Sequence, residues 1–135
     1  MVYLTRKEHF NAAHRLFNPA WSDEQNEKIF GKCSNKNFHG HNYNLYITVC
    51  GIPNIETGMI LNLQDLSKII NRVVIDRLDH KNLNLEVEFL KGIIPSTENL
   101  AMAIWDQLQS HLQGCVMYSI KLFETENNYV EYFGN

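Results

Sequence analysis

The sequence lacks any apolar run close to the ~20 residues that a membrane-spanning helix needs, and its first residues lack the apolar segment of a secretory signal. We therefore expect a cytoplasmic protein without membrane contact. Basic residues are not in excess, because 12 Lys and Arg stand against 15 Asp and Glu, for a net charge of −3. Nonspecific binding to nucleic acid is thus not favoured. The G-x-G-x-x-G and Walker fingerprints are also absent.

Cysteine is scarce and irregularly spaced, since the chain has three: Cys33, Cys50 and Cys115. An odd number at such spacing argues against a disulfide framework and indicates reduced thiols. Cys50 and Cys115 have apolar neighbours and are predicted to be small core residues. With 135 residues, of which 44% are hydrophobic, the chain can bury one compact core but not two. We expect a single domain over residues 1–135.

Alternation of apolar and polar residues predicts strands, and apolar residues at helical spacing predict two long amphipathic helices. The expected strands cover residues 3–17, 41–51, 116–125 and 129–133, and the expected helices cover residues 63–78 and 97–112, with a short one at 23–30. Residues 79–95 are predicted to be a loop. Each long helix has an apolar face that a sheet would cover. We therefore predict an α+β fold, a four-stranded antiparallel sheet with two helices on one face, in the order ββααββ.

Residues that favour helix ends and turns support these boundaries. Ser22 begins a capping-box pattern before the short helix, and Asn62 and Ser96 are the expected N-caps of the long ones. Asn127 and Asn128 suit the positive φ angles of a tight hairpin between the last two strands.

Three histidines are predicted to share one face of the first two strands. His14 continues an inward row with Phe10 and Ala12. His39 and His41 are two positions apart, and such side chains point to the same face of a strand. Three imidazoles with an open fourth position are a usual catalytic zinc site. The alternative is that His14 is a hydrogen-bonded core residue and the H-x-H pair is partly exposed.

Cys33 and the pair Asp79-His80 are candidates for proton transfer. Cys33 lies in a loop rich in Gly, Asn, Ser and Lys, where a thiol can reach solvent and be activated. A carboxylate that orients an imidazole, which in turn deprotonates a thiol, would combine the three residues. The alternative is that Asp79 and His80 satisfy carbonyl groups at the end of the preceding helix.

Glu124 extends the inward apolar row of the third expected strand by one step. A buried carboxylate is costly without a partner, and it can accept two parallel hydrogen bonds from a guanidinium-like pair of N–H groups. Ser96, Thr97 and Glu98, at the start of the second long helix, add hydroxyls, backbone N–H groups and another acid. The alternatives are a solvent-facing Glu at a strand end and ordinary helix capping.

The motifs FNAAHR, CSNKNFHGH, LDHKNLN, STEN and FETENN occur in this order across nearly the whole chain. In this they resemble the 6-pyruvoyl tetrahydropterin synthase family. The resemblance implies the tunnelling fold, in which strand-strand-helix-helix-strand-strand subunits join edge to edge into a barrel. Such subunits typically form a trimer that pairs into a hexamer, and this homo-oligomer would cover the exposed sheet edges.

The resemblance also assigns roles to particular residues. The zinc ligands of the family are matched by His14, His39 and His41. The catalytic triad, which the family assembles across a subunit boundary, is matched by Cys33, Asp79 and His80. The acid that anchors the 2-amino and N3 edge of the pterin is matched by Glu124, and further pterin contacts by Thr97 and Glu98. Ser96 stands where we expect Thr, a change that keeps the hydroxyl.

The reaction that the resemblance implies converts 7,8-dihydroneopterin triphosphate to 6-pyruvoyl-tetrahydropterin and inorganic triphosphate, as in tetrahydrobiopterin biosynthesis. Zinc would act as a Lewis acid on the side-chain hydroxyls of the substrate. Cys33, with His80 held by Asp79, would move protons between the substrate side chain and the ring. The redox change stays inside the substrate, so no nicotinamide or flavin is required. Mg²⁺ can accompany the triphosphate without a dedicated protein site.

Two other functions stay open. The 6-carboxy-tetrahydropterin synthases of deazapurine (queuosine) biosynthesis share the fold, zinc site and substrate. They usually space their Cys three residues from His-Gly-His, whereas five residues separate Cys33 from His39 here. A non-catalytic, zinc-stabilised pterin-binding protein would need the histidines and Glu124, but it would have no use for the Cys33 triad.

Overall fold

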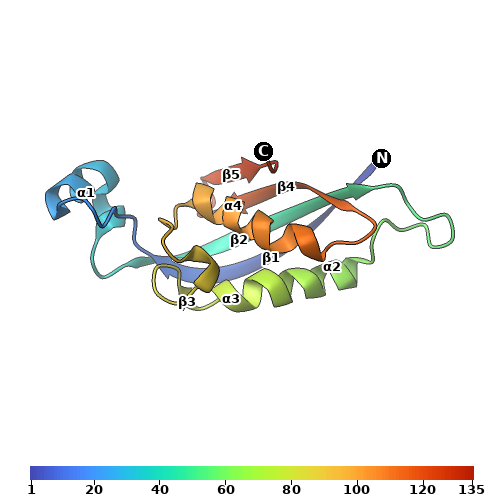
Figure 1. The fold of residues 1–135 in the computed structure, drawn as a ribbon, viewed down its shortest axis with the longest axis horizontal. Coiled ribbons are helices and arrows are strands. Elements are labelled where there is room, and N and C mark those ends of the chain that lie inside the picture. Colours follow the sequence, from blue (N-terminus) through green and yellow to red (C-terminus); the bar gives the residue numbers. More distant parts are fainter.

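The computed structural model describes residues 1–135 as a sheet with helices on one face (Figure 1). The strands are β1 (Val2–His14), β2 (His39–Gly51), β3 (Lys81–Asn82), β4 (Val116–Phe123) and β5 (Tyr129–Tyr132). The α-helices are α1 (Asp23–Phe30), α2 (Leu63–Ile70), α3 (Asp76–Leu78) and α4 (Thr97–Leu108). The sheet order is β3-β1-β2-β4-β5, antiparallel except for β3, which runs parallel to β1. The predicted α+β class is confirmed.

The long strands β1 and β2 pair along their whole length without a register shift. The register places Phe10 opposite Tyr43 and His14 opposite His39. Phe10, Tyr43 and His14 are all buried, so the inward row predicted from the alternation is confirmed. Because residues directly opposite each other in an antiparallel pair share a face, the histidines of both strands come together at one end of the sheet.

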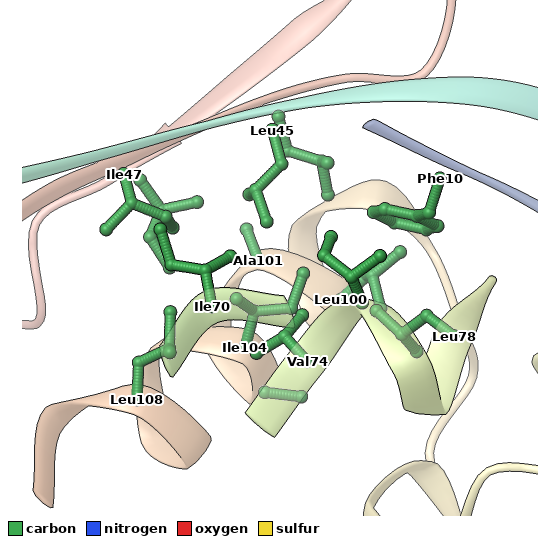
Figure 2. Packing of buried hydrophobic residues seen from close by; sticks show 14 of the residues in the cluster. Phe10, Leu45, Ile47, Ile70, Val74, Leu78, Leu100, Ala101, Ile104 and Leu108 are labelled. Carbon is green, nitrogen blue, oxygen red and sulfur yellow. The ribbon is translucent and has the colours of Figure 1, made fainter. Parts of the chain in front are cut away.

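The helices α2 and α4 cover one face of the sheet, and the hydrophobic core lies between these two layers (Figure 1). Figure 2 shows side chains of both helices meeting those of the strands: Phe10, Leu45, Ile47, Ile70, Val74, Leu78, Leu100, Ala101, Ile104 and Leu108. Burial of each large aliphatic side chain contributes about 1.5–3 kcal/mol. Asn62 and Ser96 cap the two helices, as predicted. No helix has the length and apolar character that crossing a bilayer would require.

A π-helical turn, Asn71–Ile75, lies between α2 and α3. The sequence predicts one regular helix over residues 63–78, and the chain is instead helical with a wide turn in its middle. This turn buries three consecutive residues, Val73, Val74 and Ile75, which a regular helix with one apolar face does not do. A π turn is longer by one residue than an α turn, and this gives the helix a broader apolar face here.

The strand β3 is the main difference from the predicted four-stranded sheet. It lies within residues predicted to be a loop, and it pairs with Ala12 and Ala13 of β1. Hydrogen bonds from His80 N to Asn11 O (2.6 Å) and from Leu83 N to Ala13 O (2.8 Å) flank the pairing. A strand of two residues has no periodicity to detect. It forms because it satisfies backbone groups at the edge of β1.

A β-bulge changes which residues of β4 face the core. The pairing of β2 with β4 shifts between Thr48 and Val49, after which the side-chain alternation of β4 is reversed. Val116 and Tyr118 are therefore 61% and 44% exposed, while Ile120 is buried. The predicted inward row from residue 116 to residue 124 is wrong before Ile120 and correct from there on.

Several element ends also differ from prediction. The first strand ends at His14 rather than at residue 17, and the regular part of α4 ends at Leu108 rather than at residue 112. The positive φ angles expected at Asn127 and Asn128 are not found. Among the non-glycine residues, only Phe38 and His80 have a positive φ. The loop after β4 is closed by a hydrogen bond from Glu124 N to Asn128 O (3.2 Å).

Residues 15–38 form an arm at the end of the sheet, and its helix α1 lies well away from α2 and α4 (Figure 1). The helix has the predicted bounds, and Ser22 Oγ accepts a hydrogen bond from Gln25 N at 3.1 Å. A 3₁₀ turn, Gly31–Ser34, follows it and contains Cys33. The arm then returns to the sheet at His39, the first residue of β2.

Candidate metal and substrate site

The three predicted histidines converge at the end of the β1–β2 pair. His14 is the last residue of β1, His39 the first residue of β2, and His41 follows on the same face of β2. Their ring centroids are 4.5 Å apart for His14 and His39, 5.0 Å for His14 and His41, and 4.9 Å for His39 and His41. The strand register brings together residues that are 25 or more positions apart in the sequence.

Glu124 joins the histidines from the end of β4. Its Oε1 lies 2.8 Å from His41 Nε2 and 3.6 Å from His14 Nε2. Its Oε2 accepts a hydrogen bond from Thr97 Oγ at 2.6 Å, and Thr97 is the first residue of α4. One ligand atom from each of the three histidines and from Glu124 can be chosen so that all lie within 4.8 Å of one another. Such a set of nitrogen and oxygen donors could hold a metal ion.

The imidazole nitrogens of this group are well suited to a metal ion. His14 Nε2, His41 Nε2 and both ring nitrogens of His39 are buried and make no hydrogen bond. His41 Nε2 and Glu124 Oε1 lie 2.8 Å apart without forming a hydrogen bond. Burial lowers the pKa of His14 and of His39, which keeps both rings neutral. Buried lone pairs without a donor are costly, and a cation would satisfy them.

The orientation of His14 is set by groups that surround its other nitrogen. His14 Nδ1 lies 2.8 Å from Pro95 O and 3.4 Å from Tyr43 Oη. A carbonyl oxygen only accepts hydrogen bonds, so Nδ1 carries the proton and the lone pair is on Nε2, which faces the other histidines. Burial raises the pKa of Tyr43, so its hydroxyl stays protonated. Sequence reasoning missed both neighbours, although Tyr43 lies on the inward row two residues after His41.

A cavity of about 330 Å³ adjoins this group. The predicted substrate residues Ser96, Thr97, Glu98 and Glu124 all line it. Its other walls come from the start of the arm and from the loop and strand after Glu124: Leu16, Asn128, Tyr129 and Val130. Glu124 therefore faces both the histidines and a space large enough for a small organic molecule.

Asp79 and His80 lie next to each other directly after α3. Asp79 Oδ2 is 3.0 Å from His80 Nδ1, and Asp79 Oδ1 accepts a hydrogen bond from Asn11 N at 2.9 Å. That backbone bond is the main reason why the pKa of Asp79 is lowered, with the His80 contact adding to it. His80 has a φ of 61°, and its side chain is 78% exposed. The carboxylate thus contacts an imidazole that faces outward.

Cys33 does not meet this pair within one chain. It lies in the 3₁₀ turn of the arm as a free, partly exposed thiol, and no hydrogen bond joins its side chain to Asp79 or His80. The structure therefore brings the histidines together with Glu124, Thr97 and the cavity, and brings Asp79 together with His80. No hydrogen bond joins the Cys33 side chain to either group.

The fold and the site together define a class of protein. It is an α+β protein whose sheet ends in a partly buried group of three histidines and one carboxylate, beside a cavity with polar walls. A group of this kind can bind a metal ion and hold a small polar molecule next to it.

Comparisons with known proteins place the chain within this class. The family model "6-pyruvoyl tetrahydropterin synthase" matches residues 3–135. The chain is 46% identical to the 6-pyruvoyl tetrahydrobiopterin synthase of Homo sapiens over 131 residues, which cover 97% of this chain and 90% of the relative. It is 47% identical to the protein of that name from Dictyostelium discoideum over 133 residues, which cover 98% and 96%. It is also similar to the structure of Caenorhabditis elegans 6-pyruvoyl tetrahydropterin synthase, with a TM-score of 0.93, 37% identity and coverage of 99% and 96%.

The chain therefore belongs to the 6-pyruvoyl tetrahydropterin synthase family. The relatives are matched along nearly their whole length, so the likeness is not restricted to one motif. The structural neighbour has a similar α+β arrangement over almost every residue.

Proposed function

We propose that this protein converts 7,8-dihydroneopterin triphosphate to 6-pyruvoyl-tetrahydropterin and inorganic triphosphate. The observation that carries the proposal is the direct contact between the histidine group and Glu124, a carboxylate that also lines a cavity of ligand size. A site of this form could hold a metal ion against the side chain of a pterin whose ring is bound by the carboxylate. The pyruvoyl product is supported by the names of the relatives that are 46% and 47% identical.

We propose that His14, His39 and His41 hold one zinc ion per subunit. Three imidazoles with one position open to substrate are the usual ligands of catalytic zinc. When bound, zinc would supply Lewis acidity to the hydroxyl groups of the substrate side chain. The hydrogen bond of His14 Nδ1 to Pro95 O supports this assignment, because it leaves the lone pair of Nε2 free to bind a metal ion. Mg²⁺ would come with the triphosphate, and we assign it no protein ligand.

We propose that Glu124 binds the 2-amino and N3 edge of the pterin. A carboxylate can accept two parallel hydrogen bonds from such an edge. The Thr97 hydroxyl donates to Oε2 at 2.6 Å and so orients the carboxylate. Ser96 and Glu98 line the same cavity and offer further contacts. The approach of Oε1 to His41 supports a pterin ring that lies beside the metal ligands.

We propose that Cys33 and His80, the latter oriented by Asp79, move protons between the substrate side chain and the pterin ring. The 3.0 Å contact of Asp79 with His80 supports their pairing. Since Cys33 lies apart from them in one chain, the active site would be completed by a neighbouring subunit. The redox change stays inside the substrate, so the reaction requires no nicotinamide or flavin.

We propose that the subunits form the tunnelling-fold barrel, a trimer that pairs into a hexamer. The β1, β2, β4 and β5 strands with the two long helical segments on one face would be the ββααββ unit, and β3 a minor addition. The edge strands support this, because β3 and β5 have only two and four residues and leave part of the longer strands unpaired. Tyr3 and Tyr118 lie in contact on the other face of the sheet, 54% and 44% exposed, where another subunit could cover them.

We further propose that residues 1–135 act as one domain in the cytoplasm, with a small-molecule substrate and no nucleic-acid or membrane partner. The net charge of −3 is consistent with the absence of a nucleic-acid partner.

The direct test is to incubate the zinc-loaded protein with 7,8-dihydroneopterin triphosphate and to identify the products by mass spectrometry. We expect 6-pyruvoyl-tetrahydropterin and inorganic triphosphate. Release of acetaldehyde with a carboxylated pterin would contradict this result and assign the chain to the 6-carboxy-tetrahydropterin synthases. Pterin binding without any turnover would instead indicate a non-catalytic pterin-binding protein.

A substitution tests the role of Cys33. We expect Cys33→Ala to abolish triphosphate release, because the thiol carries the proton, while zinc content and subunit assembly stay unchanged. Cys115→Ala is the matched control, since Cys115 is a free thiol at the opposite end of the sheet's long strand pair, and it should retain normal turnover. Normal turnover in Cys33→Ala would refute the proposed role.

A further inference from the structure

The turn that contains Cys33 is joined to the chain after β1 by two hydrogen bonds. Leu16 N donates to Cys33 O at 2.8 Å, and Arg15 Nε donates to Ser34 O at 2.7 Å. The hydroxyl of Ser34 is used inside the turn, where it donates to Gly31 O at 2.7 Å. The position of the Cys33 thiol therefore depends on Leu16 and Arg15, which directly follow a proposed metal ligand in the sequence.

Arg15 is itself held by groups on both sides. Its guanidinium carbon lies 3.9 Å from the centre of the Phe17 ring, so the charged plane stacks on an aromatic face. The Asn84 side chain holds the backbone of Arg15 through two hydrogen bonds. Arg15 N donates to Asn84 Oδ1 at 2.8 Å, and Asn84 Nδ2 donates to Arg15 O at 2.9 Å. Asn84 N in turn donates to Asn82 Oδ1 at 3.0 Å, and Asn82 ends the short strand β3.

We infer that Arg15 is a positioning residue that holds Cys33 at a set place relative to the metal-binding end of β1. The inference rests on the proposed function, in which Cys33 moves protons. Ser34 O is one residue from Cys33, so a displacement of that carbonyl displaces the thiol. The guanidinium is suited to this task because it is always charged, planar and able to stack while its Nε donates in one direction.

The same residue also connects three of the segments that carry proposed functional residues. It follows His14 directly, its side chain holds the turn of Cys33, and its backbone is bonded to the segment after His80. A small change at Arg15 would therefore alter the relative placement of these segments. Misplacement of reacting groups by about 1 Å can reduce a rate by about a hundredfold.

A direct contact of Arg15 with the substrate triphosphate is the rival explanation, and it makes a different prediction. Phosphate binding depends mainly on positive charge, which Lys also supplies, and its loss would raise KM. Positioning depends on the Nε donor and on the stacked plane, and Lys lacks both. Its loss would lower kcat while KM changes little.

The experiment compares Arg15→Met, Arg15→Lys and Phe17→Leu with the wild-type protein in its assembled, zinc-loaded form. Arg72→Met is the matched control, because the Arg72 side chain is exposed on the helical layer and makes no hydrogen bond or ion pair. Three quantities are measured for each variant: kcat and KM for triphosphate release, zinc content, and the rate at which iodoacetamide alkylates Cys33. Peptide mass mapping follows the alkylation, with the buried Cys50 as internal reference.

We expect kcat to fall about ten- to a hundredfold in both Arg15 variants, with KM within about twofold and zinc content unchanged. Phe17→Leu keeps the Nε donor and should show a smaller fall of the same kind. The alkylation rate of Cys33 should change in the Arg15 variants and not in Arg72→Met. The inference is overturned if kcat stays normal in Arg15→Met, or if KM rises and Arg15→Lys restores it. If Cys33→Ala is itself fully active, the proposed function of Cys33 fails first, independently of the Arg15 results.

Discussion

The contact between Thr97 and Glu124 allows a quantitative test of the proposed pterin site. Thr97→Val removes the hydroxyl that donates to Glu124 Oε2 at 2.6 Å and keeps the branched shape of the side chain. A hydrogen bond to a charged group contributes about 1.5–3 kcal/mol. The Glu124 side chain is 23% exposed, so water can partly replace the lost donor, and we take the lower limit of about 1.5 kcal/mol. Because the same bond is present without ligand, this value sets an upper limit of about tenfold on the loss of affinity for the pterin.

The assay is isothermal titration calorimetry of the zinc-loaded protein with 7,8-dihydroneopterin, which lacks the triphosphate and so reports on the ring and its side chain. Thr97→Ser is the control, because it keeps the hydroxyl and loses only a methyl group. Thr97 is 7% exposed, so the thermal midpoint Tm of each variant is measured to separate packing from binding. The reasoning is refuted if Thr97→Val binds as tightly as the wild type, or if Thr97→Ser binds as weakly as Thr97→Val.

Two further predictions concern the histidines. His39→Ala should bind far less than one zinc ion per subunit, because it removes one of the three proposed ligands, whose two ring nitrogens are buried and make no hydrogen bond. Atomic emission spectroscopy measures the zinc content, and one full ion per subunit in this variant would show that His39 is not a ligand. The metal-free protein should be less stable at pH 5.5 than at pH 7.5. Burial lowers the pKa of His14 and His39 below the ordinary value of 6.5, so on acidification the unfolded chain binds protons that the folded chain does not. The free energy of unfolding of the metal-free protein is therefore highest above that value and falls as the pH falls through it. Scanning calorimetry should show a smaller decrease for the metal-free His14→Asn/His39→Asn variant, and an equal decrease in both proteins would contradict this.

The histidine group could be predicted from the sequence because its geometry follows from local rules. Spacing of two puts His39 and His41 on one face, and the alternation around Phe10 puts His14 inward. Only the register needed the structure, and His14 proved to be directly opposite His39.

The features that the sequence did not reveal depend on contacts between distant segments. The bulge opposite Thr48 reverses the alternation of β4, and no residue type marks it. The two-residue strand β3 exists only because β1 offers unpaired backbone groups at its edge. Pro95 O is a backbone acceptor, so its bond to His14 could not be inferred from the identity of the residue. The place of Cys33 depends on the bonds made by Arg15 and Leu16, which lie outside any regular element.

The π turn at Asn71–Ile75 has a consequence for how this chain tolerates changes in length. Asp79 follows closely, and its backbone N donates to Ile75 O at 2.8 Å, so the direction in which the carboxylate leaves the helix is set by that turn. Each residue in an α-helix rotates the chain by about 100°. A π turn takes up one more residue than an α turn over about the same rotation, so deleting a single residue here and forming a regular helix would leave Asp79 and His80 on nearly the same side of the molecule. The π turn thus absorbs a surplus residue, so a chain with a regular helix here and one residue fewer could still place an aspartate and a histidine at this position.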